Sequence, residues 1–417
     1  MTSDRQAVSR RNFLAQGALA AGAIAAGPLF AANERIGVGL IGCGGRGNHH
    51  LGVIAGLKAA GVPVATVAVC DAYRPRREAS ARAHGAKAYR SHHELLADPN
   101  VNAVCIATPD HHHGRQAIDA VLAGKDVYCE KPLTHWRQID LTLRLLDEVV
   151  RSGRVLQVGT QGLSDRAWHQ AAALVREGAI GRPVHAECGY FRVGDWGERG
   201  MPVDDPAAKP GPDLDWDGFL GDSPRREFSV SRFFRWRMYL DYAGGPVTDL
   251  FPHSLAPVVK VLGLKWPETA AATGGIFRYE EREVPDTFNL LVDYPEKVTV
   301  AVLGTQANDH PGTAHRGAGS RSPVIRGWEG TLTFEGNEIV VRAARSATGT
   351  TEKRVAIERG EDIADHWRDF LDCCRSRKAP SSPVDLGCHV QIALQMGMKS
   401  FLEKKIVRFD AAARLTT

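Results

Sequence analysis

The chain has 417 residues, of which 43% are hydrophobic and 24% charged, and its formal net charge is +4. This length exceeds what one compact core usually holds and predicts two domains. Part of the positive charge lies in the first 32 residues. The remainder is nearly neutral and has no dense run of Lys and Arg, so we do not expect nucleic acid as a partner.

The first 32 residues have the pattern of an export signal. Residues 9–14 read Ser-Arg-Arg-Asn-Phe-Leu, with a twin-arginine pair at Arg10 and Arg11. An Ala- and Gly-rich apolar run follows and ends at small residues near Ala32, which suits a signal peptidase. An uncleaved membrane anchor is the alternative, but the run is short for a stable span. We therefore predict a twin-arginine signal peptide over residues 1–32, read by the twin-arginine export machinery, and a periplasmic protein.

The eight cysteines could form disulfides in an exported protein. Half of them fall beside predicted buried strands, where Cys acts as a small apolar residue. These are Cys43, Cys70, Cys105 and Cys129. The twin-arginine route also exports chains that have already folded in the reducing cytoplasm, so we predict eight free thiols.

Buried strands alternate with helices in the next part of the chain. The predicted strands cover residues 35–41, 64–70, 101–108, 127–129 and 155–158. The predicted helices cover residues 48–60, 74–84, 116–123 and 138–152. This alternation is typical of a doubly wound parallel sheet, so we assign residues 33–159 to a Rossmann domain.

The chain is richer in strands after residue 160. Strand-like runs cover residues 184–188, 287–294, 298–303 and 331–334. Residues 194–222 form an irregular stretch rich in Pro, Gly and Asp, and so long a loop is usually functional or a subunit contact. Helices near 362–377 and 390–403 are expected to pack back on the first domain. We assign residues 160–417 to a second domain.

A glycine fingerprint follows the first predicted strand. Gly42, Gly44 and Gly47 form Gly-x-Gly-x-x-Gly between a strand and a helix. In such a motif the first glycine permits a tight turn, the second lets the backbone approach a pyrophosphate, and the third allows close helix–strand packing. The helix N-terminus then faces the phosphates. This context predicts a dinucleotide site.

Asp71 ends the second predicted strand and indicates which dinucleotide is bound. A carboxylate there accepts hydrogen bonds from both ribose hydroxyls and repels a 2′-phosphate, which favours NAD. Arg74 and Arg76 leave NADP open, because an arginine there can pair with that phosphate.

Thr108 and Pro109 follow the third predicted strand and should line the nicotinamide side of the cofactor. Three consecutive histidines, residues 111–113, then suggest a metal site. Consecutive residues rarely give zinc its tetrahedral ligands. We therefore predict no metal and a loop in which His113 turns toward the cofactor.

Three motifs together carry a family resemblance. The glycine fingerprint, Thr-Pro-x-x-x-His at residues 108–113 and Glu-Lys-Pro at residues 130–132 resemble, in this order, the glucose–fructose oxidoreductase / inositol dehydrogenase (Gfo/Idh/MocA) family. Residues 158–161 look like its domain crossover. Further matches to its exported, twin-arginine branch are residues 214–217, Arg235-Trp236, Gly244-Gly245, Asp249-x-x-x-His253 and His366-Trp367-x-x-Phe370.

The resemblance implies an α/β fold in which the Rossmann domain precedes an α+β domain with an open-faced, mostly antiparallel sheet. It also implies that Lys131, Asp249 and His253 converge near the nicotinamide. The predicted cofactor contacts are Gly42, Gly44, Gly45, Arg46, Gly47, Asp71, Thr108, Pro109, His113, Glu130, Lys131 and Gln161. Members often carry an acid three residues after the histidine, where this chain has Ala256. The substrate pocket is therefore not assigned by analogy with inositol enzymes.

The three converging residues suit the oxidation of a secondary alcohol. His253 would take the hydroxyl proton, because imidazole titrates near neutral pH. Asp249, four residues earlier, would share a helical face with it and orient the ring. Lys131 would stabilise alkoxide character. The structural alternatives are that Lys131 is a cation near the cofactor, Asp249 a helix cap and His253 a buried hydrogen-bonded histidine.

Arg235 and Trp236 either grip a sugar or belong to the core. We predict an NAD(P)-dependent oxidoreductase that acts on the secondary hydroxyl of a sugar or polyol. Little free cofactor is expected outside the cytoplasm, so the cofactor should be tightly held and recycled in place. One alternative is a redox-neutral glycosidase that works through a 3-keto sugar, elimination and addition. Another is a cofactor-binding protein without turnover. A homo-oligomer is expected.

Overall fold

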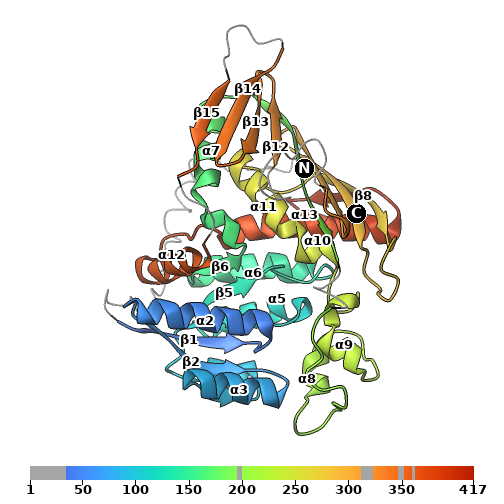
Figure 1. Ribbon diagram of the computed structural model, residues 1–417. Coiled ribbons are helices and arrows are strands. Elements are labelled where there is room, and N and C mark those ends of the chain that lie inside the picture. The colour runs from blue at the N-terminus through green and yellow to red at the C-terminus, as the bar shows by residue number, and fades with distance from the viewer. Residues whose placement is uncertain (1–33, 195–199, 311–322, 346–351, 359–361) are drawn as a thin grey trace, which may run out of the picture.

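The computed structural model describes residues 34–194, 200–310, 323–345, 352–358 and 362–417. The predicted signal peptide lies outside these residues. Figure 1 shows a first domain, coloured blue to cyan, below a second domain whose strands run from green to red. The helices that follow residue 362 return to the first domain.

The first domain is built on a six-stranded parallel sheet in the order β3-β2-β1-β4-β5-β6. Its strands are β1 (Ile36–Ile41), β2 (Val64–Cys70), β3 (Lys87–Tyr89), β4 (Ala103–Ile106), β5 (Asp126–Glu130) and β6 (Leu156–Gly159). Every residue of β1, β4, β5 and β6 is buried, as expected for strands covered on both faces. The order reverses between β1 and β4, which places a ligand crevice at their carboxyl ends. The predicted Rossmann fold is confirmed.

Helices cover both faces of this sheet. They are α2 (Gly45–Ala59), α3 (Arg74–His84), α4 (His92–Leu96), α5 (Asp110–Leu122) and α6 (Ile139–Ser152). The prediction of a loop over residues 111–113 was wrong, because α5 already begins at Asp110. Three histidines and Gly114 have no apolar periodicity, which appears only from Ala117 onward.

The second domain is built on a long, mostly antiparallel sheet in the order β15-β14-β13-β12-β7-β10-β9-β8-β16-β17. Its strands are β7 (Pro183–Val193), β8 (Thr269–Gly275), β9 (Thr287–Tyr294), β10 (Val298–Thr305), β12 (Val324–Gly327), β13 (Gly330–Glu335), β14 (Glu338–Ala343), β15 (Lys353–Ala356), β16 (Val407–Asp410) and β17 (Leu415–Thr416), with β11 (Ala307–Asn308) against β7. Among the strands of this sheet that the structure describes, only β7 and β10 pair in parallel.

One face of this sheet carries the core. Helices α7 (Arg166–Arg176), α11 (Phe251–Leu262) and α13 (Val384–Glu403) pack against it around Phe288 and Val300. On the opposite face Leu291 is 51% exposed, because β9 alternates between buried and solvent-facing residues. The predicted open-faced sheet is therefore present.

The C-terminal helices tie the two domains together. Trp367 in α12 (Ile363–Ser376) is fully buried and stacks on Tyr128 of β5 at 4.6 Å between ring centroids. Helix α13 contributes Cys388 to the core of the first domain and Ile392 to that of the second. The second sheet thus sits at a fixed position over the first.

Residues 200–245, here called the covering segment, leave the second sheet and lie against the first domain (Figure 1). The segment contains α8 (Trp216–Leu220), α9 (Val230–Phe234) and the 3-10 turn η2 (Trp236–Met238). An aromatic cluster that includes Phe219 and Phe233 holds it together and takes in Tyr73 of the first domain. A short helix α10 (Pro246–Asp249) and then α11 return the chain to the second domain.

All eight cysteines are buried free thiols, as the sequence predicts. Across the described residues, none of the helices combines the length and the apolar character that crossing a bilayer requires.

Candidate active site

Two adjoining cavities, of about 300 Å³ and about 520 Å³, run along the carboxyl ends of the first sheet. Every predicted cofactor residue except Gly47 lines one of them. Gly44 and Thr108 line both, so the cavities meet at the glycine loop. The covering segment forms the outer wall through Phe219, Phe233 and Trp236.

The glycine loop fits a dinucleotide. Gly42 has φ +98°, which a residue with a side chain rarely adopts. A Cβ on Gly47 would lie 1.9 Å from the Gly42 carbonyl oxygen, so this glycine permits close packing of α2. A Cβ on Gly44 would instead point into the cavity, with only Arg76 Nη1 within 4 Å, at 3.7 Å. The space beside Gly44 is where a pyrophosphate would approach the backbone.

Asp71 and two arginines define the ribose end. The Asp71 carboxylate accepts hydrogen bonds from the backbone N–H groups of Cys43 at 2.7 Å and Tyr73 at 2.8 Å. Burial raises the pKa of Asp71, although these bonds and the charge of Arg76 oppose the shift. Arg76 forms a bidentate pair with Asp204 at 2.6 and 2.7 Å.

Arg74 is paired in the same way, with its Nε donating to Asp213 at 2.6 Å. Both arginines are therefore engaged by carboxylates of the covering segment. A 2′-phosphate would have to compete with these carboxylates, and it would also meet Asp71. The arrangement favours NAD over NADP.

Glu130 is the centre of a buried network. Its Oε1 accepts hydrogen bonds from Arg46 Nε at 2.7 Å, His50 Nε2 at 2.9 Å and Gln161 Nε2 at 2.9 Å. Burial alone would raise the pKa of Glu130, but the charge of Arg46 and the His50 hydrogen bond hold it well below its usual value. Glu130 is therefore an anion that positions Arg46 and Gln161 at the cavity wall.

The sequence did not indicate His50, which completes this network. Burial lowers the pKa of His50, and Trp367 Nε1–H donates to its Nδ1 at 3.0 Å. Nδ1 is then an acceptor, so Nε2 carries the proton that is donated to Glu130. Helix α12 thereby fixes a buried histidine behind Glu130, which lines the larger cavity. In the sequence, only the position of His50 on the helix after the glycine fingerprint could have pointed to it. Its hydrogen-bond donor, Trp367, belongs to the predicted His366-Trp367 motif.

The three consecutive histidines connect segments of the fold. His113 lines the larger cavity, and its two ring nitrogens lie 2.6 Å from the Pro132 carbonyl and 2.8 Å from the Thr108 carbonyl. His111 and His112 each place Nε2 2.7 Å from the Phe219 carbonyl. His113 thus holds the segment after Lys131, while the other two anchor the covering segment.

Lys131 and Asp249 meet at the far end of the larger cavity. Lys131 Nζ donates to Asp249 Oδ1 at 2.6 Å and to the Asp249 carbonyl at 2.7 Å, and Arg237 Nε lies 3.4 Å from Oδ1. Burial alone would raise the pKa of Asp249, but the charges of Lys131 and Arg237 lower it well below the usual range. Asp249 therefore stays ionised at neutral pH. His253 lines the same cavity.

The prediction that Asp249 and His253 share one continuous helix was wrong. Helix α10 ends at Asp249 and α11 begins at Phe251, with Leu250 between them. Pro252 has no N–H to donate to a carbonyl four residues back and its ring clashes there, so the helix is interrupted. The Asp249 carboxylate contacts Lys131 and Arg237, and it does not share a helical face with His253.

Of the two residues predicted to contact the substrate, Trp236 lies at the cavities and Arg235 does not. Trp236 lines both cavities, but Arg235 Nε donates to the Met201 carbonyl at 3.1 Å inside the covering segment. Arg237 takes its place at the larger cavity, with its guanidinium 4.2 Å from the Trp236 ring centroid. The irregular turn η2 sets which residue points inward, and no periodic pattern in the sequence could have shown it.

This fold and these cavities define a two-domain protein with a dinucleotide-binding Rossmann domain. Residues 36–160 match the family model GFO_IDH_MocA, described as "Oxidoreductase family, NAD-binding Rossmann fold". The first domain of this chain therefore carries the NAD-binding Rossmann fold that this family model describes.

Curated relatives match over about a third of the chain. Inositol 2-dehydrogenase 2 of Saccharopolyspora erythraea is 35% identical over 159 residues, which cover 37% of this chain and 46% of that protein. An uncharacterized oxidoreductase of Rhizobium meliloti is 38% identical over 135 residues, which cover 32% of this chain and 39% of that protein. The matched region thus spans less than half the length of these relatives.

Solved structures match over both domains. Levoglucosan dehydrogenase in complex with NADH and levoglucosan has a TM-score of 0.67 at 19% identity, covering 90% of this chain and 99% of that chain. The WlbA dehydrogenase from Bordetella pertussis, in complex with NADH and UDP-GlcNAcA, has a TM-score of 0.65 at 19% identity, with the same coverage. At this identity the likeness shows the shared fold.

Proposed function

We propose that this protein is an NAD-dependent oxidoreductase acting on the secondary hydroxyl of a sugar or polyol. The observation that carries the proposal is the Lys131–Asp249 pair, which shares one cavity of about 520 Å³ with His253 and the glycine loop. The names of similar proteins, inositol 2-dehydrogenase and levoglucosan dehydrogenase, support a polyhydroxylated substrate.

The side chains divide the chemistry between them. Bound NAD would accept or return a hydride at the substrate carbon. Lys131 Nζ has three donors, two of which are bonded to Asp249, so one is left to donate to a substrate oxygen in the cavity. Asp249 stays ionised and keeps Lys131 in place. His253 takes the hydroxyl proton, because an imidazole exchanges protons near neutral pH.

The experiment that tests the proposal follows the bound cofactor directly. Purified protein is mixed with a panel of sugars and polyols, and the absorbance of reduced NAD is recorded over a single turnover. We expect at least one compound to reduce the bound NAD. A cofactor that stays oxidised with the whole panel, and stays reduced with the corresponding ketoses, would contradict the proposal.

We propose further that the cofactor is held tightly and is recycled in place. The covering segment forms main-chain hydrogen bonds with the first domain, from Arg74 N to the Asp213 carbonyl at 2.8 Å and from Asp215 N to the Ala72 carbonyl at 3.0 Å. The Arg76–Asp204 pair lies beside them. These contacts enclose the cavity that contains Asp71, so the adenosine end of NAD would leave only after they break.

Weakening this enclosure should speed NAD release. We expect Asp204→Asn combined with Asp213→Asn to raise the NAD dissociation rate about fivefold, since each partly exposed pair contributes little on its own. Rapid dilution of protein loaded with the reduced cofactor, followed by the loss of bound NADH fluorescence, measures this rate. Asp217→Asn is the matched control, because Asp217 pairs with Arg225 within the covering segment. An unchanged rate in the double variant would show that the segment does not retain NAD.

We also propose that residues 1–32 direct export by the twin-arginine route. The support is the sequence pattern around Arg10 and Arg11. Replacing both by Lys should leave the precursor in the cytoplasm, because the export machinery reads this pair. Cell fractionation measures the distribution, and unchanged periplasmic accumulation of the double variant would refute the route.

A further inference from the structure

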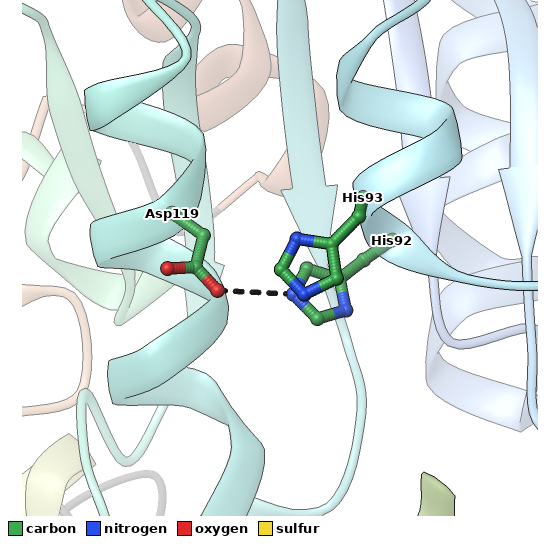
Figure 2. A group of neighbouring side chains, drawn as sticks. All are labelled: His92, His93 and Asp119. Carbon is green, nitrogen blue, oxygen red and sulfur yellow. Dashed lines mark hydrogen bonds and ion pairs between the residues drawn. The ribbon is translucent and has the colours of Figure 1, made fainter.

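Two histidines and an aspartate gather outside the residues assigned to catalysis. Figure 2 shows His92 and His93 of α4 facing Asp119 of α5. One nitrogen from each imidazole and one carboxylate oxygen all lie within 4.8 Å of one another. His92 Nε2 is 3.1 Å from Asp119 Oδ2. His92 and His93 are consecutive in α4, an unusual spacing for two ligands of one ion, but their rings lie side by side and Asp119 faces them from α5.

The local backbone fixes this arrangement. Ser91 caps α4 by accepting a hydrogen bond from Glu94 N, and the Glu94 carboxylate accepts one from Ser91 N. This capping box makes His92 and His93 the first two residues of the helix. Their rings are in contact, with centroids 3.9 Å apart and planes tilted by 38°. Both rings therefore point toward the face of α5 that carries Asp119.

The spacing suits a small divalent cation. Ligands about 2.0 to 2.2 Å from a tetrahedral zinc ion stand about 3.3 to 3.6 Å apart. The distance of 3.1 Å between His92 and Asp119 is already close to this value. His93 is exposed, so its ring can rotate to complete the set without disturbing the core.

The polar side chains around the group are held by other partners. Arg115 reaches Asp222 at 3.5 Å, and the neighbouring His112 is held by the Phe219 carbonyl. These neighbours therefore have partners of their own outside the group.

We propose that His92, His93 and Asp119 form a binding site for a divalent transition metal ion of the zinc class. Two imidazole nitrogens and one carboxylate oxygen are the donor set that such ions prefer, and water completes the coordination. His92 and His93 also line the smaller cavity beside Asp71. The ion would therefore sit at the rim of the adenosine end of the cleft. The site does not depend on the proposed dehydrogenase activity.

The test measures metal binding by the full chain with NAD bound and no polyhistidine tag. Zinc titrated into the wild type by calorimetry should bind with one equivalent at this site, and Co²⁺ should give a visible d–d spectrum. Asp119→Asn, His92→Gln and His93→Ala should each weaken zinc binding by more than about 100-fold, since losing a direct ligand costs more than losing an outer hydrogen bond.

His84→Ala is the matched control, because His84 lies in the last turn of the neighbouring helix α3 and outside the group. It should bind zinc like the wild type. His92→Gln retains a donor for Asp119, so its melting temperature should stay unchanged. The proposal is overturned if the wild type binds no zinc, or if the three ligand variants and the control bind it equally.

Discussion

Lys131→Met is expected to lower the turnover number about 100-fold while NAD stays bound. Removing one preorganised electrostatic donor at a developing oxyanion costs on the order of 3 kcal/mol. Lys131 lines the larger cavity at its Asp249 end and takes no part in the contacts of the glycine loop with Asp71. The measurement is reduction of bound NAD by a sugar that the wild type oxidises, normalised to the nucleotide released on denaturation.

A second variant separates catalysis from stability. Lys131→Met leaves the buried Asp249 carboxylate with Arg237 at 3.4 Å, and an incompletely paired buried charge destabilises a fold. Lys131→Met with Asp249→Asn removes that charge and should recover the melting temperature but not the turnover. A purely structural Lys131 would instead give cofactor loss or a lower melting temperature, with turnover per bound NAD unchanged.

The pH dependence of the Lys131–Asp249 pair follows from its electrostatics. The pKa of Asp249 is lowered in the folded protein, so the stability that it contributes is present above the pKa of an unfolded aspartate. That contribution is lost only as the pH falls into the acid range, through the folded pKa. Any change in rate near neutral pH must therefore come from another group.

The first domain could be predicted closely because its elements carry local signals. The apolar, partly β-branched run Val64–Cys70 has the bounds that the sequence predicts, and α3 begins and ends where expected. Strand β3 was missed because Lys87 and Ala88 are exposed and the strand has only three residues. It is recognisable as a strand only through its pairing with β2.

Site residues that belong to sequence motifs were predicted correctly. Contacts between segments that are distant in the sequence were missed. The glycine loop, Glu130 and Lys131 lie in the cleft as expected. The network around Glu130 depends on α12, which is more than 200 residues away in sequence. The approach of Asp119 to His92 depends on how α4 and α5 pack beside β4. No sequence period encodes either contact.

His253→Ala is expected to abolish most of the turnover and to flatten the pH–rate profile between about pH 6 and 8. Two imidazoles line the larger cavity, and both ring nitrogens of His113 lie against backbone carbonyls, so proton transfer is assigned to His253. NAD content should match the wild type, since His253 lies outside the glycine loop. His253→Gln, which preserves polarity and approximate size without a titrating ring, should behave like the alanine variant if proton transfer is the role.

The same variant distinguishes net oxidation from redox-neutral glycoside cleavage. Cleavage through a 3-keto sugar begins with the same oxidation, so His253→Ala should block both the transient reduction of bound NAD and the release of an aryl leaving group. Both signals are followed optically in one stopped-flow experiment with an aryl glycoside. If His253→Ala cleaves the glycoside at the wild-type rate yet fails to oxidise a free sugar, one shared site cannot perform both reactions, and the proton-transfer role assigned to His253 applies to the oxidation alone.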